Sequence, residues 1–320
     1  MDNSHKTHFC LAGKTIWVAG QTGMVGSAVL KRLASEDCEL FLVKRPELDL
    51  RDQKAVRSWL NKNKPDVIVV AAATVGGILA NSSRPAEFLY DNLAIETNII
   101  HGAYEIGVQK LLFLGSACIY PRDASQPMSE EALLTGPLEP TNQWYAVAKI
   151  AGIKLCEAYR KQYQCDFISA QPNNLYGAGD NFDPDTSHVI PALIVKAHAA
   201  KTTVQSSIEI WGTGSPMREF LHVDDLADAL VHLLKTYSGL TQINIGTGEE
   251  ISIHELAQSV ADTVGFNGEL VFDSSKPDGA MRKLLDATRM NKLDWAPSIH
   301  LKEGLESTYK WYLQNVVEPT

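Results

Sequence analysis

Short runs of apolar residues alternate with longer amphipathic segments through the first half of the chain. The apolar runs predict β-strands, and the helical periodicity of the segments between them predicts α-helices. Because these runs are apolar throughout, each strand is expected to be buried on both faces, as in a parallel sheet covered by helices. The predicted strands cover residues 15–19, 40–43, 67–72, 111–115 and 166–170, and the predicted helices cover residues 27–35, 52–63, 86–106 and a segment around Tyr145.

After residue 177 this alternation stops, and residues 178–187 have the composition of a loop. Further helices are predicted over residues 191–200 and 224–234. Further strands are predicted over residues 208–211, 242–245 and 270–272, and the second of these is expected to return to the main sheet. The predicted fold class is α/β: a doubly wound parallel sheet of the Rossmann type with a smaller, discontinuous α/β substrate domain. We assign residues 1–13 to a flexible N-terminal arm, residues 14–177 and 218–248 to the dinucleotide-binding domain, and residues 178–217 and 249–320 to the substrate domain.

Composition narrows the class of protein without identifying it. The 320 residues include 45% hydrophobic and 21% charged residues, which is ordinary for a globular enzyme. A net charge of −9 argues against a partner that is a nucleic acid or a membrane surface. Five cysteines without a C-x-x-C pairing, and an N-terminus without the apolar core of a signal peptide, predict reduced thiols and a cytoplasmic location. No membrane span and no metal site are expected.

A glycine-rich loop follows the first predicted strand and opens the first predicted helix. It reads Gly20-Gln21-Thr22-Gly23-Met24-Val25-Gly26. Glycines let a backbone turn tightly and approach a pyrophosphate, whose charge is favoured at a helix N-terminus. Any tight turn between a strand and a helix favours glycine, so the loop alone is a weak signal. Its context between a strand and a helix makes it a predicted dinucleotide site.

The end of the second strand distinguishes the two nicotinamide cofactors. An acidic residue there binds a ribose 2′-hydroxyl, whereas an arginine accommodates a 2′-phosphate. The sequence offers Lys44 and Arg45, with no acid before Glu47. We therefore predict NADP(H), with Arg45 on the phosphate and with Asp49 and Leu50 lining the adenine. The alternative is a solvated basic pair at the end of a strand.

Tyr145 and Lys149 stand one helical turn apart, downstream of Ser116. A cation at this spacing shares a helix face with the tyrosine, and its charge is expected to lower the pKa of the phenol toward the working range. A serine hydroxyl from another segment completes a polar pocket for a carbonyl oxygen. A lone Y-x-x-x-K is most often an ordinary surface helix, but the glycine loop and Ser116 together favour a dehydrogenase.

Two further side chains carry acid–base chemistry. Cys118 lies two residues beyond Ser116, and in an extended segment the two side chains would face one pocket, where a thiolate is a capable base. A buried structural cysteine is the ordinary alternative. His188, in the loop entering the second domain, is on its own more often structural than catalytic. Spacing alone gives only weak support for residues that would bind a diphosphate or a base. The candidates are Lys196, Trp211, Arg218, Asp278, Arg282 and Lys283.

Longer motifs run from about residue 14 to the C-terminus and resemble those of the extended short-chain dehydrogenase/reductases, in particular members that epimerise and reduce GDP-4-keto-6-deoxy sugars. They include A-A-T-V-G-G-I at 72–78, F-L-G-S-A-C-I-Y-P at 113–121, L-E-P-T-N at 138–142, N-L-Y-G at 174–177, D-N-F at 180–182, S-H-V-I-P-A-L at 187–193, W-G-T-G at 211–214, M-R-E-F-L-H-V-D-D at 217–225 and K-P-D-G at 276–279. So many matches are far more specific than the glycine loop.

The resemblance implies a role for each matching residue. Ser116, Tyr145 and Lys149 correspond to the reductase triad, while Cys118 and His188 correspond to the base and the acid of C3/C5 epimerisation. It implies substrate contacts from Lys196, Trp211, Arg218 and Asp278, and a homodimer built from helices that flank the sheet. Beyond the glycine loop, Arg45, Asp49 and Leu50, the implied NADP(H) contacts are Leu114, Gly115, Ser116, Lys149, Pro172, Asn173, Asn174, Leu175 and His188.

Three positions depart from the family pattern. Ala117 replaces a frequent serine, Thr22 replaces a basic residue of some members, and Lys196 is a point charge where some members have an arginine. Several functions stay open at this point. They are a sister enzyme for another GDP-4-keto sugar, such as a dideoxy or heptose derivative, reduction or single-centre epimerisation alone, and an NADP-binding regulator without chemistry.

Overall fold

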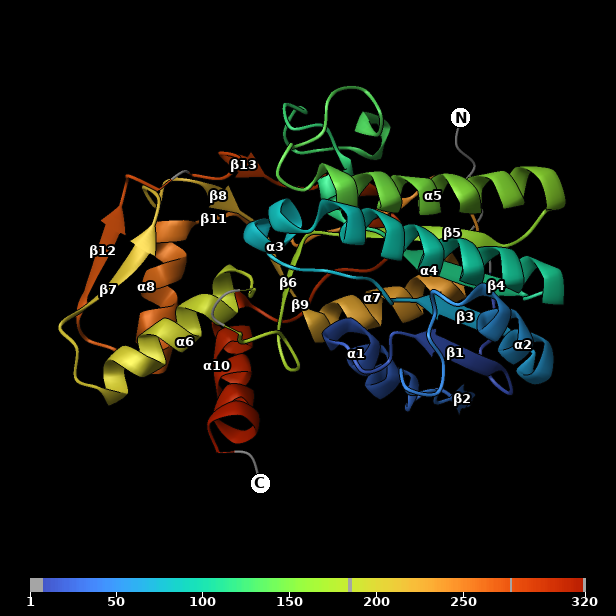
Figure 1. Ribbon diagram of the computed structural model, residues 1–320, viewed down its shortest axis with the longest axis horizontal. Coiled ribbons are helices and arrows are strands. Elements are labelled where there is room, and N and C mark those ends of the chain that lie inside the picture. Colours follow the sequence, from blue (N-terminus) through green and yellow to red (C-terminus); the bar gives the residue numbers. More distant parts are fainter. Residues whose placement is uncertain (1–7, 184–185, 277, 319–320) are drawn as a thin grey trace.

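A parallel six-stranded sheet forms the centre of the computed structural model, which describes residues 8–183, 186–276 and 278–318 (Figure 1). Every neighbouring pair in this sheet is parallel, and the strand order is β10-β5-β4-β3-β1-β2. β3 and β4 are buried along their whole length, as their apolar runs predict, and the one charged residue among them, Lys110, pairs with Asp166 at 2.8 Å. The strands are β1 (Thr15–Ala19), β2 (Glu39–Phe41), β3 (Val67–Val70), β4 (Lys110–Leu114), β5 (Phe167–Pro172) and β10 (Ile243–Ile245).

Helices cover both faces of this sheet (Figure 1). α1 (Met24–Leu33) and α7 (Val223–Thr236) pack on one face and share a hydrophobic cluster with it. α2 (Gln53–Asn63), α4 (Pro85–Ile106) and α5 (Gln143–Tyr163) cover the other face, with a second cluster. The chain runs from β1 outward to β2 and then crosses to β3 on the other side of β1. This reversal opens a crevice at the carboxyl ends of the strands, where such folds bind ligands.

Local signals explain where several helices begin and end. Asp52 caps α2 by accepting a hydrogen bond of 3.0 Å from the backbone N–H of Ala55. Pro85 opens α4, and Gly107 ends it with a φ of +74°, a conformation that favours glycine. These signals set where α2 begins and where α4 begins and ends.

The remaining elements lie outside the main sheet and its covering helices, and some of them form a smaller group around a third hydrophobic cluster. A parallel pair of strands, a three-stranded sheet and the strand pair β6–β9 accompany the helices of this part. The elements are α3 (Ile78–Ser83), β6 (Asn174–Tyr176), α6 (Val189–Thr202), β7 (Ser207–Trp211), β8 (Met217–Arg218), β9 (Phe220–His222), β11 (Ile251–Ser252), α8 (Ile253–Val264), β12 (Glu269–Asp273), β13 (Arg282–Lys283), α9 (Thr288–Asn291) and α10 (Leu301–Tyr312), with short helical turns at Ala117–Ile119, Glu130–Ala132 and Leu313–Val317.

The predicted fold class is confirmed, and so is the return of the strand near residues 242–245 to the main sheet. Part of the predicted flexible arm is wrong. Residues 1–7 lie outside the described residues, but Leu11 is buried in the first cluster and the Phe9 N–H donates to the Lys235 carbonyl oxygen at 2.8 Å. The apolar side chains of Phe9 and Leu11 anchor this segment by packing on the first cluster.

The division into two domains stays a prediction, and one segment departs from it. Met290, Leu293 and Trp295 belong to the stretch assigned to the substrate domain, yet they pack into the first cluster beside the main sheet. Among the described residues, the helices are all too short or too polar to cross a membrane.

Candidate active site

A single large cavity, with a volume of about 1680 Å³, opens at the carboxyl ends of the sheet strands. This volume exceeds that of an ordinary small-molecule site and has room for two ligands. The predicted site residues come from many segments, and all of them line this cavity. They are Gly20, Gln21, Thr22, Gly23, Met24, Val25, Gly26, Arg45, Asp49, Leu50, Leu114, Gly115, Ser116, Cys118, Tyr145, Lys149, Pro172, Asn173, Asn174, Leu175, His188, Lys196, Trp211, Arg218 and Asp278.

The glycine loop provides an open surface at one end of the cavity. Gly20 has a φ of +92°, and a Cβ there would lie 2.6 Å from the backbone nitrogen of Ala72. A Cβ on Gly26 would lie 2.1 Å from the carbonyl oxygen of Gly20, so neither position tolerates a side chain. A Cβ on Gly23 would meet nothing nearer than that same carbonyl oxygen, at 3.5 Å, which leaves this side of the loop accessible.

The N-terminus of α1 lies at this loop. Gly23 is its N-cap residue, no side chain caps it, and its first turn contains no acidic residue. Its first N–H groups and the positive end of its dipole are therefore available to an anion. The residues present thus fit the pyrophosphate of a dinucleotide.

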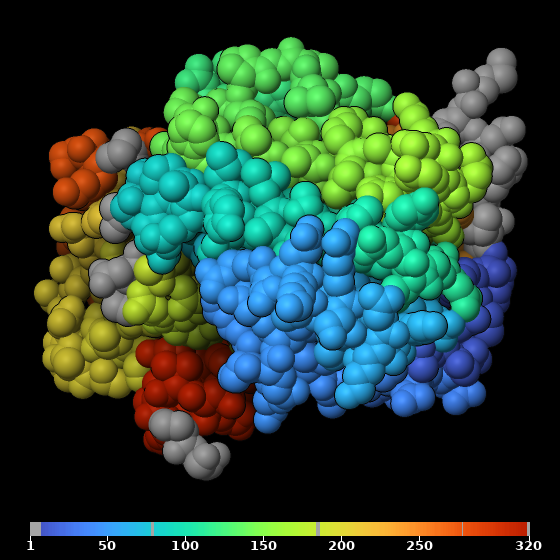
Figure 2. Space-filling view, turned by 45° about the vertical axis from the view of Figure 1, so that its right-hand side comes forward, coloured from blue at the N-terminus to red at the C-terminus, as the bar shows by residue number. Residues whose placement is uncertain are grey.

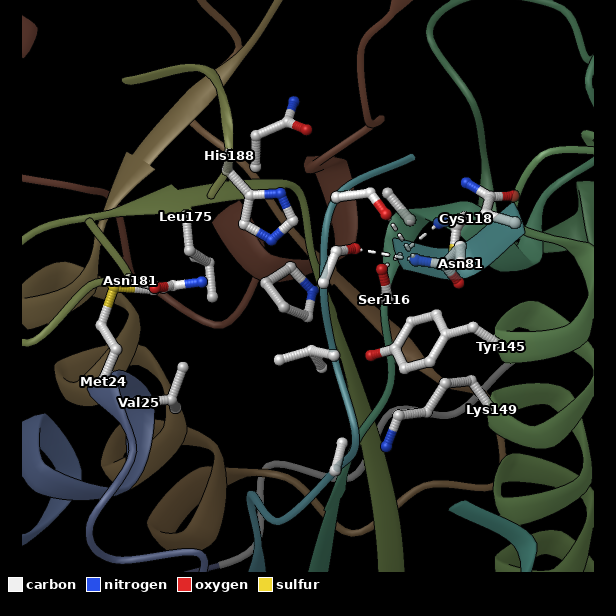
Figure 3. Close-up of a pocket in the computed structure, with 18 of the residues that line it drawn as sticks. Met24, Val25, Asn81, Ser116, Cys118, Tyr145, Lys149, Leu175, Asn181 and His188 are labelled. Carbon is white, nitrogen blue, oxygen red and sulfur yellow. Dashed lines mark hydrogen bonds between the residues drawn. The ribbon is translucent and has the colours of Figure 1, made fainter. Parts of the chain in front are cut away.

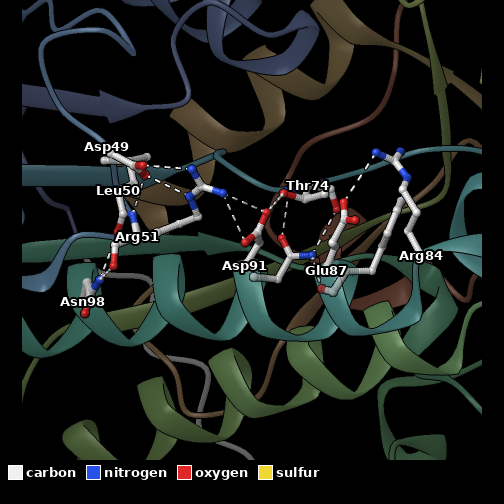
Figure 4. Close-up of polar contacts among 10 residues, drawn as sticks. Asp49, Leu50, Arg51, Thr74, Arg84, Glu87, Asp91 and Asn98 are labelled. Atoms are coloured by element: carbon white, nitrogen blue, oxygen red, sulfur yellow. Dashed lines mark hydrogen bonds and ion pairs between the residues drawn. The ribbon is translucent and has the colours of Figure 1, made fainter.

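Charged side chains line the cavity beyond the end of β2 (Figure 4). Arg51 pairs with Asp49 at 2.9 Å and with Asp91 on α4 at 3.3 Å. Hydrogen bonds from Arg51 lower the pKa of the Asp49 carboxyl to about 2. The Asp49 carboxylate, which was predicted to line the adenine, is thus already paired with Arg51. Arg45 is exposed and forms no hydrogen bond or ion pair with another described residue, so its guanidinium is available to a phosphate.

Ser116, Tyr145 and Lys149 come together in the middle of the cavity, as the sequence predicts (Figure 3). Ser116 directly follows β4, and α5 carries the other two side chains on one face. In Figure 3 the hydroxyls of Ser116 and Tyr145 point into the same part of the cavity. The Lys149 ammonium lies 5.8 Å from the centre of the Tyr145 ring and 4.7 Å from that of Phe113.

The expectation that Lys149 lowers the pKa of Tyr145 is wrong in this structure. Burial raises the pKa of the phenol well above its ordinary value, and Cys118 and Glu96 raise it further. The lysine charge has little effect because Glu96, on α4, pairs with it at 3.0 Å. Tyr145 therefore stays protonated near neutrality, the form that a proton donor needs.

Cys118 and His188 lie on different sides of the cavity (Figure 3). The sequence predicted that an extended segment would turn Ser116 and Cys118 toward one pocket. That backbone conformation is wrong, because residues 117–119 form a turn of 3-10 helix. Ser116 caps this turn, and its Oγ accepts a hydrogen bond of 3.4 Å from the Cys118 N–H. His188 occupies the N-cap position of α6, at the opposite wall.

The surroundings of this pair favour the uncharged forms of both groups. Burial raises the pKa of the Cys118 thiol, an effect that its hydrogen bond to Ser116 and the charges of Lys283 and Lys149 oppose. Burial lowers the pKa of the His188 imidazole, although solvent in the open cavity reaches the ring. Lys283, on β13, borders the same cavity, and burial lowers its pKa in turn.

The segment of residues 172–175 is held rigidly behind the cavity. The Asn173 side chain donates to the buried carboxylate of Glu219. Glu219 also accepts hydrogen bonds from the N–H groups of Gly248 at 2.7 Å and Leu285 at 3.2 Å. One buried carboxylate thus ties the end of β5 to the loop that follows β13.

The far end of the cavity contains the predicted substrate residues. Trp211 is 62% exposed, and the ammonium groups of Lys196 and Lys276 lie 5.8 and 5.5 Å from the centre of its ring system. Arg218 borders the cavity, and burial lowers its pKa. The Asp278 carboxylate accepts hydrogen bonds from the Thr213 N–H at 2.9 Å and hydroxyl at 2.7 Å. Asp278 therefore holds the turn beside Trp211, and this role does not depend on a contact with a ligand.

Sequence reasoning missed several groups at the site. Glu96 carries no local motif because its partner, Lys149, lies on another helix, and Arg51 was missed although it pairs with the nearby Asp49 as well as with Asp91 on α4. Asp180 was quoted only within a motif, yet burial raises the pKa of its carboxyl to about 7 and it borders the cavity. Within the described part of the chain, no three His, Cys, Asp or Glu side chains are grouped to hold a metal ion.

Known proteins share this architecture and sequence. The family model described as NAD dependent epimerase/dehydratase matches residues 16–246. A GDP-L-fucose synthase of Sinorhizobium fredii (strain NBRC 101917 / NGR234) is 57% identical over 310 residues, covering 97% of this chain and 99% of that protein. A solved GDP-L-fucose synthetase from Naegleria fowleri bound to NADP has a TM-score of 0.92 and 29% identity, covering 99% of this chain and 98% of that one.

A solved GDP-6-OMe-4-keto-L-xylo-heptose reductase from C. jejuni has a TM-score of 0.88 and 37% identity, covering 95% of this chain and 99% of that one. These relatives and solved structures match between 95% and 99% of this chain. The chain therefore belongs to the NAD dependent epimerase/dehydratase family and, within it, to the extended short-chain dehydrogenase/reductases.

Proposed function

We propose that this protein converts GDP-4-keto-6-deoxy-D-mannose to GDP-L-fucose by epimerisation at C3 and C5 and NADPH-dependent reduction of the C4 ketone. The observation that carries the proposal is the placement of a Ser–Tyr–Lys group and a Cys–His pair around one cavity. The GDP-L-fucose synthases among its relatives support this substrate.

Epimerisation uses the two opposed walls of the cavity. A 4-ketone acidifies the C–H bonds at C3 and C5, and inverting each centre needs a base on one face and an acid on the other. Cys118 takes the proton from carbon, and His188 returns a proton from the opposite side. Ser116 and Tyr145 hold O4 by hydrogen bonds while negative charge develops on that oxygen.

Reduction uses the hydroxyl of Tyr145. When bound, the reduced nicotinamide would supply the hydride for C4. Tyr145 donates its proton to O4, and Ser116 holds that oxygen in place. Lys149 stabilises the resulting phenolate and would contact the nicotinamide ribose. The glycine loop, Arg45 and the segment of residues 172–175 would hold the remaining parts of NADP(H). Lys196, Trp211 and Arg218 would hold the GDP moiety, with Asp278 fixing the turn beside it.

The opposed pKa shifts of Cys118 and His188 predict the pH dependence of epimerisation. The active pair, a thiolate with an imidazolium, contains the same number of protons as the neutral pair. Its fraction is therefore constant between the lowered imidazole pKa and the raised thiol pKa. We expect deuterium exchange into the keto sugar, measured with NADP⁺, to be flat at least from about pH 6.5 to about pH 8.5. The rate should fall only outside this window, below the lowered imidazole pKa and above the raised thiol pKa. A rate that climbs steadily with pH across this window would contradict the assignment.

Arg45 is expected to decide the choice between NADPH and NADH. Replacing Arg45 with alanine removes a charge-assisted contact with the 2′-phosphate, which should raise the KM for NADPH by roughly tenfold to a hundredfold. The KM for NADH should change little. Arg57→Ala is the matched control, because Arg57 pairs with Glu105 away from the cavity. Equal effects of Arg45→Ala on both cofactors would argue against a phosphate contact.

The deciding experiment follows NADPH oxidation with GDP-4-keto-6-deoxy-D-mannose in deuterated water and identifies the product by NMR. Consumption of NADPH, deuterium at C3 and C5, and a product of L-fucose configuration are expected. Deuterium at one centre or none would favour a sister reductase, such as one for a GDP-4-keto-heptose. If NADPH binds but is not consumed, the substrate is another keto sugar or the protein binds NADPH without catalysing a reaction.

We further propose a homodimer formed through α4 and α5, which lie side by side at the surface (Figure 2). Exposed apolar side chains on these helices support this surface: Tyr90, Trp144, Val147 and Tyr163. Sedimentation velocity should give twice the mass of one chain, and a Trp144→Asp variant should sediment as a monomer.

A cytoplasmic location fits the five unpaired cysteines.

A further inference from the structure

Glu96 is a buried carboxylate directly beneath the candidate active site. It lies on α4, with 1% of its side chain exposed, and its Oε1 lies 3.0 Å from the Nζ of Lys149. The Lys149 side chain is only 2% exposed. Neither carboxylate oxygen of Glu96 has another partner among the residues that the structure describes. The ion pair with Lys149 is therefore the one interaction that offsets the burial of this charge.

Packing between α4 and α5 leaves a space for this carboxylate. Gly152 lies one helical turn beyond Lys149 on α5, and a Cβ at this glycine would approach Glu96 Oε2 to 2.9 Å and a Phe113 ring carbon to 2.3 Å. No side chain at residue 152 could coexist with this arrangement. The Lys149 ammonium is consequently bounded by the Glu96 carboxylate, the Phe113 ring and the Tyr145 ring.

We propose that Glu96 is a positioning residue, which holds the charged Lys149 ammonium in place to receive the nicotinamide ribose and to stabilise the phenolate of Tyr145. The proposal rests on the function proposed above. Glu96 borders neither ligand and acts through Lys149, because its carboxylate lies behind the lysine and away from the cavity lining.

The electrostatic consequence follows from the groups that face Glu96. These are Lys149, Tyr145 and Cys156, all on α5. Burial raises the pKa of Glu96, and the paired Lys149 ammonium opposes this shift. The charge of Glu96 in turn raises the pKa of Tyr145. Without Glu96, the buried Lys149 ammonium loses its counter-charge, and Tyr145 gives up its proton at lower pH.

The test uses Glu96→Gln, which removes the charge and keeps the shape. We expect the alkaline limb of the pH profile for single-turnover C4 reduction to move to lower pH by about one unit or more. Binding of NADPH, followed by its fluorescence, should weaken by roughly tenfold at about pH 8.5 and much less at about pH 6.5. Glu105→Gln is the matched control, since it makes the same change on the same helix in a pair with Arg57.

A double-mutant cycle separates positioning from folding. In a Lys149→Met background, Glu96→Gln should have no further effect on NADPH binding, because its partner is gone. A pH profile equal to that of wild type would overturn the proposal, as would a lowered Tm with an unchanged profile, since either shows a merely structural role. If wild type fails to reduce the substrate, the proposed function fails. The pH dependence of NADPH binding to Glu96→Gln then still decides the role of Glu96.

Discussion

Replacing Tyr145 with phenylalanine is expected to slow C4 reduction by roughly a hundredfold to ten-thousandfold, the usual contribution of a positioned general acid. The phenol stays protonated near neutrality because burial, Cys118 and Glu96 raise its pKa. Its hydroxyl shares a part of the cavity with the hydroxyl of Ser116. Phenylalanine keeps the ring beside Lys149 but has no proton to give to O4.

The measurement is single-turnover oxidation of NADPH, with cofactor affinity determined separately by fluorescence. Affinity should be nearly unchanged, because the pair of Lys149 with Glu96 does not involve the phenol oxygen. Tyr163→Phe is a matched control on the same helix, because Tyr163 lies outside the cavity lining and its hydroxyl accepts a hydrogen bond from Gln162. Reduction at the wild-type rate in Tyr145→Phe would remove Tyr145 as the proton donor.

Replacing Cys118 with serine should reduce deuterium exchange at C3 and C5 by at least about a hundredfold. A serine hydroxyl is far less acidic than a thiol, so the variant has almost no anionic base at this position even though the side chains are similar in size. Lys283 and Lys149, which oppose the effect of burial on the thiol, cannot compensate for so large a difference in acidity.

Exchange is followed by NMR of the keto sugar in deuterated water with NADP⁺, which prevents reduction. Cys165→Ser is the control, because Cys165 is half-buried and lies outside the cavity lining. It shows whether replacing a thiol elsewhere in the protein also slows exchange. Tyr145→Phe should continue to exchange, so the two variants separate the two half-reactions. Normal exchange in Cys118→Ser would show that another group is the base.

The sequence predicts the main sheet and its helices because their hydrophobic patterns are long. β1 spans the residues predicted, and α4 begins one residue before its prediction. The strands β6, β8, β9, β11 and β13 contain only two or three residues each, too few for a periodic pattern. They form because the surrounding chain brings them together.

The candidate site was predictable where residues carry a motif and hidden where tertiary packing supplies the partner. Tyr145 and Lys149 are close in sequence, so their shared helix face could be inferred. Glu96 and Lys149 lie on helices α4 and α5, and their pairing depends on how these helices pack. For the same reason the direction of the shift in the pKa of Tyr145 could not be inferred from the spacing alone.

The common cavity of about 1680 Å³ makes the configuration of the released sugar a matter of kinetic competition. The C4 carbonyl makes its neighbouring carbons acidic, and hydride addition removes that carbonyl. Once the alcohol has formed, the stereocentres at C3 and C5 are fixed. On the proposed chemistry, inversion must therefore be faster than hydride transfer. Side chains that slow hydride transfer relative to inversion therefore determine how much of the product has the inverted configuration. They can do so even if they never contact C3 or C5.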